Sequence, residues 1–190
     1  MTDAISSSPA PSSVPPAAAD VPPRILAATV EGVALVAVSG RASFKLVPAF
    51  RQALQAARLA SPSLMLVDMA AVTAVDSSFM GAIASASQQA SKSDAVPLRF
   101  LNIPAKILAL LHGLGVDRLM RIMPATEAVD LTGLVAALAP VEAAAEDDQA
   151  MAATLLDTHE TLARLSPENL AKFRSVVELL RQDVGRTSAQ

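Results

Sequence analysis

The alternation of short apolar runs with helical patterns constrains the fold of this chain most. It begins with two apolar runs, Ile25–Val30 and Val33–Ser39, which are separated by Glu31 and Gly32. Two such runs around a two-residue turn containing glycine predict a β-hairpin. Apolar residues then recur at spacings of three and four, which predicts a helix; they are Phe44, Val47, Phe50, Leu54 and Ala57.

The same alternation continues along the chain. Leu64–Val67 and Leu98–Leu101 are short apolar runs typical of strands, and a helical pattern follows Asp76 between them. A third helix is predicted over Ala105–Leu111 and a last strand over Leu119–Met123. The order β-β-α-β-α-β-α-β predicts an α/β fold, with a mixed sheet that is parallel in its later part and covered by helices.

Composition divides the chain into four parts. Residues 1–23 contain six prolines among Ser and Ala, and a segment with so few large apolar side chains is expected to be disordered. Residues 24–123 form the predicted α/β domain. Residues 124–149 are a connector, which could hold a further helix over Leu131–Leu138.

Residues 150–185 predict a helical hairpin that is separate from this domain. Ser166-Pro167-Glu168 is a strong helix start, with Ser as N-cap, Pro in the first turn and an acid beside it. An apolar stripe lies on each side of it: Met151, Leu155, Leu156, Leu162 and Leu165, then Leu170, Phe173, Val176, Val177, Leu180 and Val184. Two helices cannot bury both stripes alone, so the hairpin should dock on the main domain, on its twin in a homodimer, or on a partner.

Composition also excludes several classes of function. The formal net charge of -3 and 3% aromatic content argue against nucleic-acid binding. Cysteine is absent, and His112 and His159 are isolated, so no metal site is predicted. We expect His112 to end the third helix and His159 to lie on the hairpin surface. No apolar run is long enough to insert in a membrane, and no secretory signal precedes Arg24, so a cytoplasmic location is expected.

The informative stretch runs from Leu64 to Gly81, with the sequence LMLVDMAAVTAVDSSFMG. A strand is followed by Asp76, Ser77 and Ser78, which open a helix. Taken by spacing alone, Ser77 is a helix N-cap and Asp76 complements the helix dipole. Capping serines are common, so the pattern by itself does not identify a functional site.

This stretch resembles the signature of the STAS family, whose bacterial members include the anti-sigma factor antagonists. Their pattern places Asp-Ser-Ser/Thr-Gly-Leu-Gly after a strand. Further similarity lies in Val38–Arg41, Leu98–Asn102 and Leu110–Leu119. The resemblance covers about Ile25 to Met123 and implies the same β-β-α-β-α-β-α-β fold.

The resemblance implies a switch controlled by phosphorylation. Ser77 takes the place of the serine that a partner kinase, doubling as anti-sigma factor, phosphorylates and a phosphatase restores; Ser78 is the fallback. The implied partner-binding residues are Asp76, Ser77, Ser78, Phe79, Met80, Gly40, Arg41 and Ser43. Three of them depart from the pattern, since Phe79 replaces a glycine, Met80 a leucine, and Ser43 a common acid. Phe79 could therefore contact a partner, or pack on the third helix.

Two other functions are compatible with parts of this sequence. The first is a constitutive scaffold, like STAS subunits that dock on transporter ATPases for lipid or anion traffic. The second is a small hydrolase using Asp76, Ser77 and His112, but no Gly-x-Ser-x-Gly elbow is present. No phosphate-binding glycine loop occurs either, so ATP must come from a partner. We therefore expect a protein that is not an enzyme and needs no cofactor.

Overall fold

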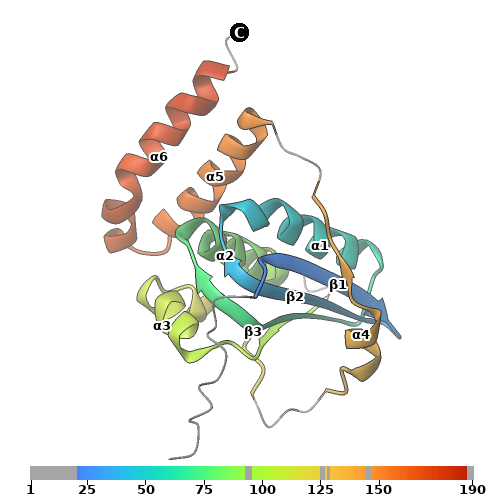
Figure 1. Cartoon of the computed structure of the whole chain (residues 1–190). Helices are drawn as coiled ribbons and strands as arrows, with labels where there is room; N and C mark the ends of the chain where they lie inside the picture. The colour runs from blue at the N-terminus through green and yellow to red at the C-terminus, as the bar shows by residue number, and fades with distance from the viewer. Residues whose placement is uncertain (1–20, 93–95, 125–126, 128, 144–146, 188–190) are drawn as a thin grey trace, which may run out of the picture.

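The computed structural model describes residues 21–92, 96–124, 127, 129–143 and 147–187. Figure 1 shows a sheet with helices packed around it and a pair of long helices at one end. The elements follow in the order β1 (Arg24–Val30), β2 (Val33–Ala42), η1 (Phe44–Leu46), α1 (Val47–Leu59), β3 (Leu64–Val75), α2 (Ser77–Lys92), β4 (Leu98–Leu101), α3 (Ala105–Gly113), η2 (Asp117–Leu119), α4 (Thr132–Ala137), β5 (Ala139–Pro140), α5 (Asp148–Ala163) and α6 (Pro167–Thr187). The expected tail falls largely on residues 1–20, outside the described residues.

The sheet is mixed, as predicted, with strand order β4-β3-β2-β1-β5. β1 and β2 form the antiparallel hairpin, and Glu31 and Gly32 turn it with φ of 50° and 78°. Positive φ at both turn residues matches the twist of the two strands. β3 pairs in parallel with both β2 and β4. The predicted hairpin and the parallel later part of the sheet are therefore confirmed.

Three strand predictions need correction. β3 does not stop at Val67 but continues to Val75, with two register shifts against β2, between Ala37 and Ser39 and between Gly40 and Arg41. Leu119–Met123 is not a strand, because only Ile122 bridges to Phe100. The fifth strand is instead β5, a two-residue segment that pairs antiparallel with β1. A strand this short, ending in proline, leaves no periodic pattern to detect.

The sheet buries both of its faces. Alternate strand residues point to opposite sides. Val36, Met65 and Val67 pack with Phe50 of α1 and Ile83 of α2 in the larger core. On the opposite face is a smaller cluster, formed by Leu35, Leu66, Leu101 and Leu134 of α4. Figure 1 shows α1 and α2 together on one side of the sheet and α4 beside β1.

The helical hairpin docks on the main domain, the first of the three partners considered for it. α5 and α6 pack on each other, and α5 packs on α2 (Figure 1). The predicted start of α6 is confirmed, because the Ser166 hydroxyl accepts the N–H of Asn169 at 3.1 Å. The backbone N–H of Glu168 and then the Ser166 hydroxyl hold the pKa of the Glu168 carboxyl below its usual value.

A buried side chain fastens the hairpin turn to the sheet domain. Asn169 is only 4% exposed, and its Nδ2 donates to the carbonyl oxygens of Leu114 (2.9 Å) and Leu162 (3.1 Å). Leu114 follows α3 and Leu162 belongs to α5. One amide therefore joins both hairpin helices to the end of α3.

Candidate phosphorylation and docking site

The start of α2 is organised by Asp76. Its Oδ1 accepts the N–H of Phe79 at 2.9 Å, and its backbone carbonyl accepts the N–H of Met80 at 3.0 Å. These bonds make Asp76 the N-cap and Ser77 the first helical residue. The expectation that Ser77 caps the helix is therefore wrong. The second carboxylate oxygen of Asp76, Oδ2, also accepts the N–H of Phe44 at 2.9 Å.

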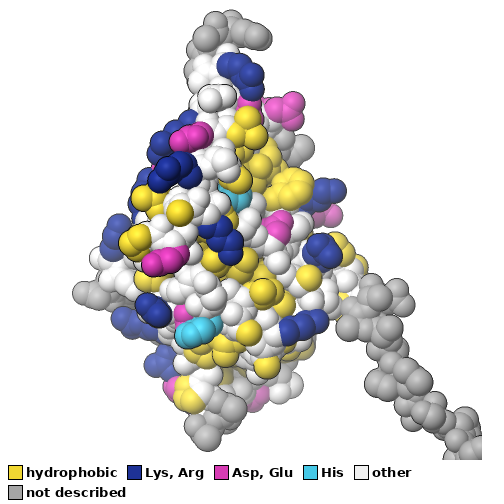
Figure 2. Space-filling model, turned by 90° about the vertical axis from the view of Figure 1, so that its left-hand side faces the viewer, with side chains coloured by type: hydrophobic (Ala, Val, Ile, Leu, Met, Phe, Trp, Pro, Cys, Tyr) yellow, Lys and Arg dark blue, Asp and Glu magenta, His cyan; other side chains and the backbone are white. Residues whose placement is uncertain are grey.

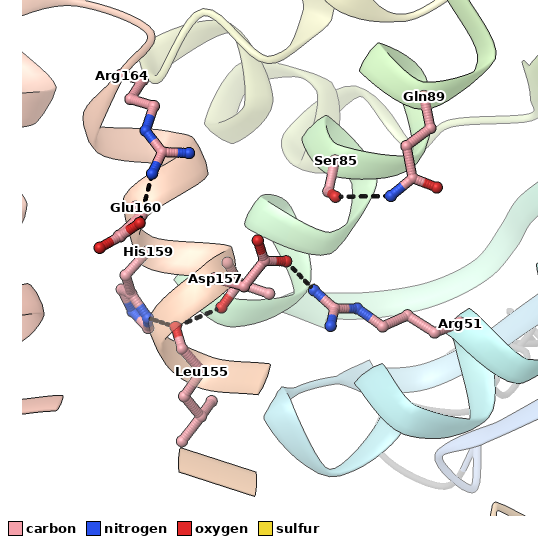
Figure 3. A network of polar contacts seen from close by, with 9 residues as sticks. Arg51, Ser85, Gln89, Leu155, Asp157, His159, Glu160 and Arg164 are labelled. Carbon is pink, nitrogen blue, oxygen red and sulfur yellow. Dashed lines mark hydrogen bonds and ion pairs between the residues drawn. The ribbon is translucent and has the colours of Figure 1, made fainter. Parts of the chain in front are cut away.

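Ser77 is consequently free to bond elsewhere, and its partner is on the hairpin. Its Oγ lies 3.1 Å from Nε2 of His159, a residue of α5. Nδ1 of His159 lies 2.8 Å from the carbonyl oxygen of Leu155, which can only accept (Figure 3). Nδ1 therefore carries the proton, Nε2 accepts, and the Ser77 hydroxyl donates. Ser77 itself is half-buried.

His159 is not on the hairpin surface, contrary to expectation. It is 7% exposed, and its ring meets that of Phe173 edge-on at 5.7 Å. His159 was missed as a site residue because nothing in its sequence neighbourhood indicates a contact with a serine 82 positions away. Only the docking of α5 on α2 brings the two side chains together.

α2 and α5 cross at a glycine. A Cβ built on Gly81 would overlap the backbone carbonyl of Thr158, so no larger residue fits without moving α5. Thr158 is one of three buried threonines on α5, with Thr154 and Thr161. Their spacings of four and three place them on one helix face. Because Thr158 touches Gly81, this threonine stripe faces α2.

Three of the predicted partner-binding residues lie in the interior. Ser78, Phe79 and Met80 are 6%, 0% and 8% exposed. The Phe79 ring packs against Phe50 of α1, with centroids 5.0 Å apart. Phe79 is therefore a core residue and not a surface contact, in the same buried cluster as Ile107 and Leu111 of α3. The buried position of Ser78 leaves Ser77 as the more accessible serine of the pair.

The β2–α1 connection lies beside the same helix start. The N–H of Asp76 donates to the carbonyl of Ala42, and Phe44 is bonded to the Asp76 carboxylate. Among the predicted residues here, Arg41 is exposed and Ser43 half-buried. Phe44 is 39% exposed, an aromatic surface residue that the helical pattern had placed in the core.

Gly40 has a structural role in this connection. Its φ is 67°, a conformation that favours glycine, and a Cβ there would lie 2.5 Å from the carbonyl oxygen of Val21. The neighbouring Ser39 hydroxyl donates to the carbonyl of Pro22 at 2.9 Å. Residues 21–23 thus pack over Gly40, which is buried rather than available to a partner.

Other chemistries find little support in the part of the chain that is described. His112 lies near the end of α3 and pairs with Asp117, so it does not join Ser77 in a triad. No group of three or more His, Asp or Glu that could hold a metal occurs among the described residues. None of the described helices is both long and apolar enough to cross a bilayer. Figure 2 shows charges of both signs interspersed on the face it presents.

Comparison with known proteins identifies the domain that carries this site. The family model described as "Mlab, STAS domain" matches residues 26–124. The chain therefore belongs to the STAS family. The match ends before α4, so α4, β5 and the α5–α6 hairpin lie outside it. No curated protein matches the chain.

Solved structures similar to this chain include two anti-sigma factor antagonists. One, from Mycobacterium paratuberculosis, is 22% identical over 61% of this chain and 95% of its own, with a TM-score of 0.48. The antagonist SpoIIAA in its unphosphorylated form is 15% identical over 56% and 93%, with a TM-score of 0.46. SLC26A9 is 19% identical over 53% of this chain but only 22% of its own length, with a TM-score of 0.42.

Proposed function

We propose that this protein is a partner-switching regulator of the anti-sigma factor antagonist type, controlled by phosphorylation of Ser77. In this scheme the unphosphorylated protein binds a serine kinase that is also an anti-sigma factor, and so releases a sigma factor. A phosphatase reverses the modification. The protein itself catalyses no reaction and acts in the cytoplasm.

The proposal depends on the different hydrogen-bonding roles of Asp76 and Ser77. Asp76 supplies both the helix cap and the bond to Phe44, so the Ser77 hydroxyl has no role in forming α2. A phosphoryl group there would add about -1.5 to -2 charges without removing the cap. The added charge would lie beside the Asp76 carboxylate and near the β2–α1 connection, where Arg41 and Phe44 are exposed. It would therefore change the affinity of this surface for a partner protein.

Affinity capture from cells tests the proposal. Wild type, Ser77→Ala and Ser77→Asp are used as baits, and bound proteins and Ser77 phosphorylation are identified by mass spectrometry. We expect wild type to recover an ATP-binding kinase, and Ser77→Asp to lose at least about tenfold of it, which corresponds to about 1.4 kcal/mol of binding free energy. Ser85→Asp is the matched control, because Ser85 lies two turns further along α2 and is also half-buried.

Equal recovery of the kinase by wild type and Ser77→Asp would contradict the switch. The second candidate is a constitutive scaffold that docks on a transporter ATPase. The bond between Ser77 and His159 favours it, because a serine already engaged within the protein can be purely structural. Capture of an ATP-binding transporter subunit by all three baits, with Ser77 unmodified in cells, would support that alternative.

A further inference from the structure

The α5–α6 hairpin lies outside the STAS match, yet it covers the residue on which the proposed switch depends. We propose that this hairpin is an internal cap over Ser77: it must leave α2 before Ser77 can be phosphorylated, and the phosphoryl group then prevents it from docking again. This inference rests on the proposed function, since it concerns regulation of the same serine.

His159 lies directly against the serine. Its Nε2 accepts the Ser77 hydroxyl at 3.1 Å, and the residue is only 7% exposed. In phosphorylation, Ser77 Oγ loses its proton and forms a bond to the γ-phosphorus of a nucleoside triphosphate held by the kinase, while the bond to the β–γ bridging oxygen breaks and the diphosphate leaves. A kinase active site must surround Oγ, and with the His159 ring 3.1 Å from this atom it has to displace α5 to do so.

α5 cannot shift aside while it remains docked. At Gly81 the backbone of α5 already fills the space that a single methyl group would need. At the start of α6, the Asn169 amide fixes the hairpin turn to Leu114. Ser77 lies one turn before Gly81 on α2, and its Oγ is already 3.1 Å from the His159 ring. A phosphoryl group directed toward α5 would therefore collide with this ring, so phosphorylation should disfavour the docked arrangement.

The hairpin can separate as a unit once its contacts with the main core open. Besides three threonines, α5 contributes Leu162 and Ala163 to that core. The Thr158 hydroxyl donates within its own helix, to the carbonyl of Leu155 at 2.8 Å, so it stays bonded after separation, whereas the bond from Asn169 to Leu114 must break. The His159–Phe173 ring contact joins α5 to α6 and would leave with the hairpin. Across to α1, Arg51 and Asp157 form an ion pair whose side chains are 34% and 52% exposed, and such exposed pairs contribute little (Figure 3).

A thiol-accessibility experiment tests the cap on the purified full chain. The protein has no cysteine, so Thr158→Cys introduces a single thiol on α5, at a position that is 0% exposed and faces Gly81 of α2. Its rate of reaction with N-ethylmaleimide reports separation of α5 from α2. The rate is compared in the unphosphorylated parent and in protein made with phosphoserine incorporated at position 77 during translation. Met65→Cys, at a site in β3 that is 1% exposed, reports unfolding of the sheet domain in parallel.

Gly81→Ala provides a second way to displace the cap, without added charge. The methyl group would push α5 away, while alanine favours the α2 helix itself. Gly113→Ala is the matched control, since a Cβ there meets no atom within 4 Å. We expect phosphorylated Ser77 and Gly81→Ala each to raise the reaction rate of the Thr158→Cys thiol at least about tenfold, and Gly113→Ala to leave it unchanged.

An unchanged rate with phosphorylated Ser77 overturns the cap. A rate that rises equally for the Met65→Cys thiol also overturns it, because the whole domain would then be unfolding. The experiment needs no kinase, so its result is independent of the proposed function. If Ser77 proves unmodified in cells, the proposed function fails even where this measurement shows that the hairpin opens.

Discussion

The hydrogen bond between Ser77 and His159 predicts a measurable coupling energy between α2 and α5. A double-mutant cycle isolates it, with Ser77→Ala, His159→Leu and the double variant. Leucine is close to histidine in size and keeps an apolar contact with Phe173. It also removes the bond to Leu155 and the ring contact, but these losses occur in both arms of the cycle and cancel.

The structure sets the expected size of this coupling. The bond is between two neutral groups at 3.1 Å, and such bonds contribute about 0.5–1.5 kcal/mol net. Ser77 is half-buried, so its hydroxyl can reach water once the hairpin separates, which favours the lower half of that range. We therefore expect a coupling of about 0.5–1 kcal/mol, or a two- to fivefold change in the opening equilibrium of α5.

Native-state hydrogen exchange of the α5 amides measures this opening equilibrium, and urea unfolding of the same four proteins measures the free energy of unfolding. Ser85→Ala combined with His159→Leu is the matched control, because the Ser85 hydroxyl contacts Gln89 and should be additive with His159 (Figure 3). A coupling energy below about 0.3 kcal/mol for Ser77 and His159, no larger than in this control, would refute a stabilising hydrogen bond between α2 and α5 at these residues.

Two further predictions concern residues at the start of α2. Phe79→Ala should lower the free energy of unfolding by about 3–5 kcal/mol, because the ring is fully buried against Phe50; a loss under about 1 kcal/mol in urea unfolding would contradict a core role. Asp76→Ala should cost about 1–2 kcal/mol in the same assay, through loss of the cap and of the bond to Phe44. Asp76→Asn should cost less, since its amide oxygen can still cap the helix, and equal losses for the two variants would argue against capping.

The sequence predicts the sheet domain well because its signals are local. The turn at Glu31-Gly32, the run Leu98–Leu101 and the start of α6 at Ser166 each depend on neighbouring residues, and all three are confirmed. β3 was underestimated because Asp68 resembles a strand end. Its carboxylate instead accepts the N–H of Ala70 in β3 and the side-chain amide of Asn102, which follows β4, so the polar side chain has partners and the strand continues.

The cover over the site could not be predicted, for a reason that the threonines of α5 illustrate. Thr158 lies within the predicted apolar stripe, between Leu155 and Leu162, and Thr154 and Thr161 lie beside it, so the buried face of α5 is wider than the apolar residues alone indicate. These threonines are buried because a threonine hydroxyl can bond to a carbonyl of its own helix, as Thr158 does, and small side chains permit close packing. A pattern of apolar residues does not predict an interface that includes threonines, so the contact between His159 and Ser77 could not be predicted from it.

The short connection between β5 and α5 sets how far a released hairpin can travel. β5 ends at Pro140 and α5 begins at Asp148, so the tether is residues 141–147, seven residues long. Fully extended, it spans at most about 25 Å. Val141 is itself anchored to β1, donating to the carbonyl of Ile25 at 2.9 Å. A tether this short gives an effective concentration on the order of millimolar. Any protein that binds at Ser77 must therefore compete with the α5–α6 hairpin, which stays at this effective concentration because it is covalently attached.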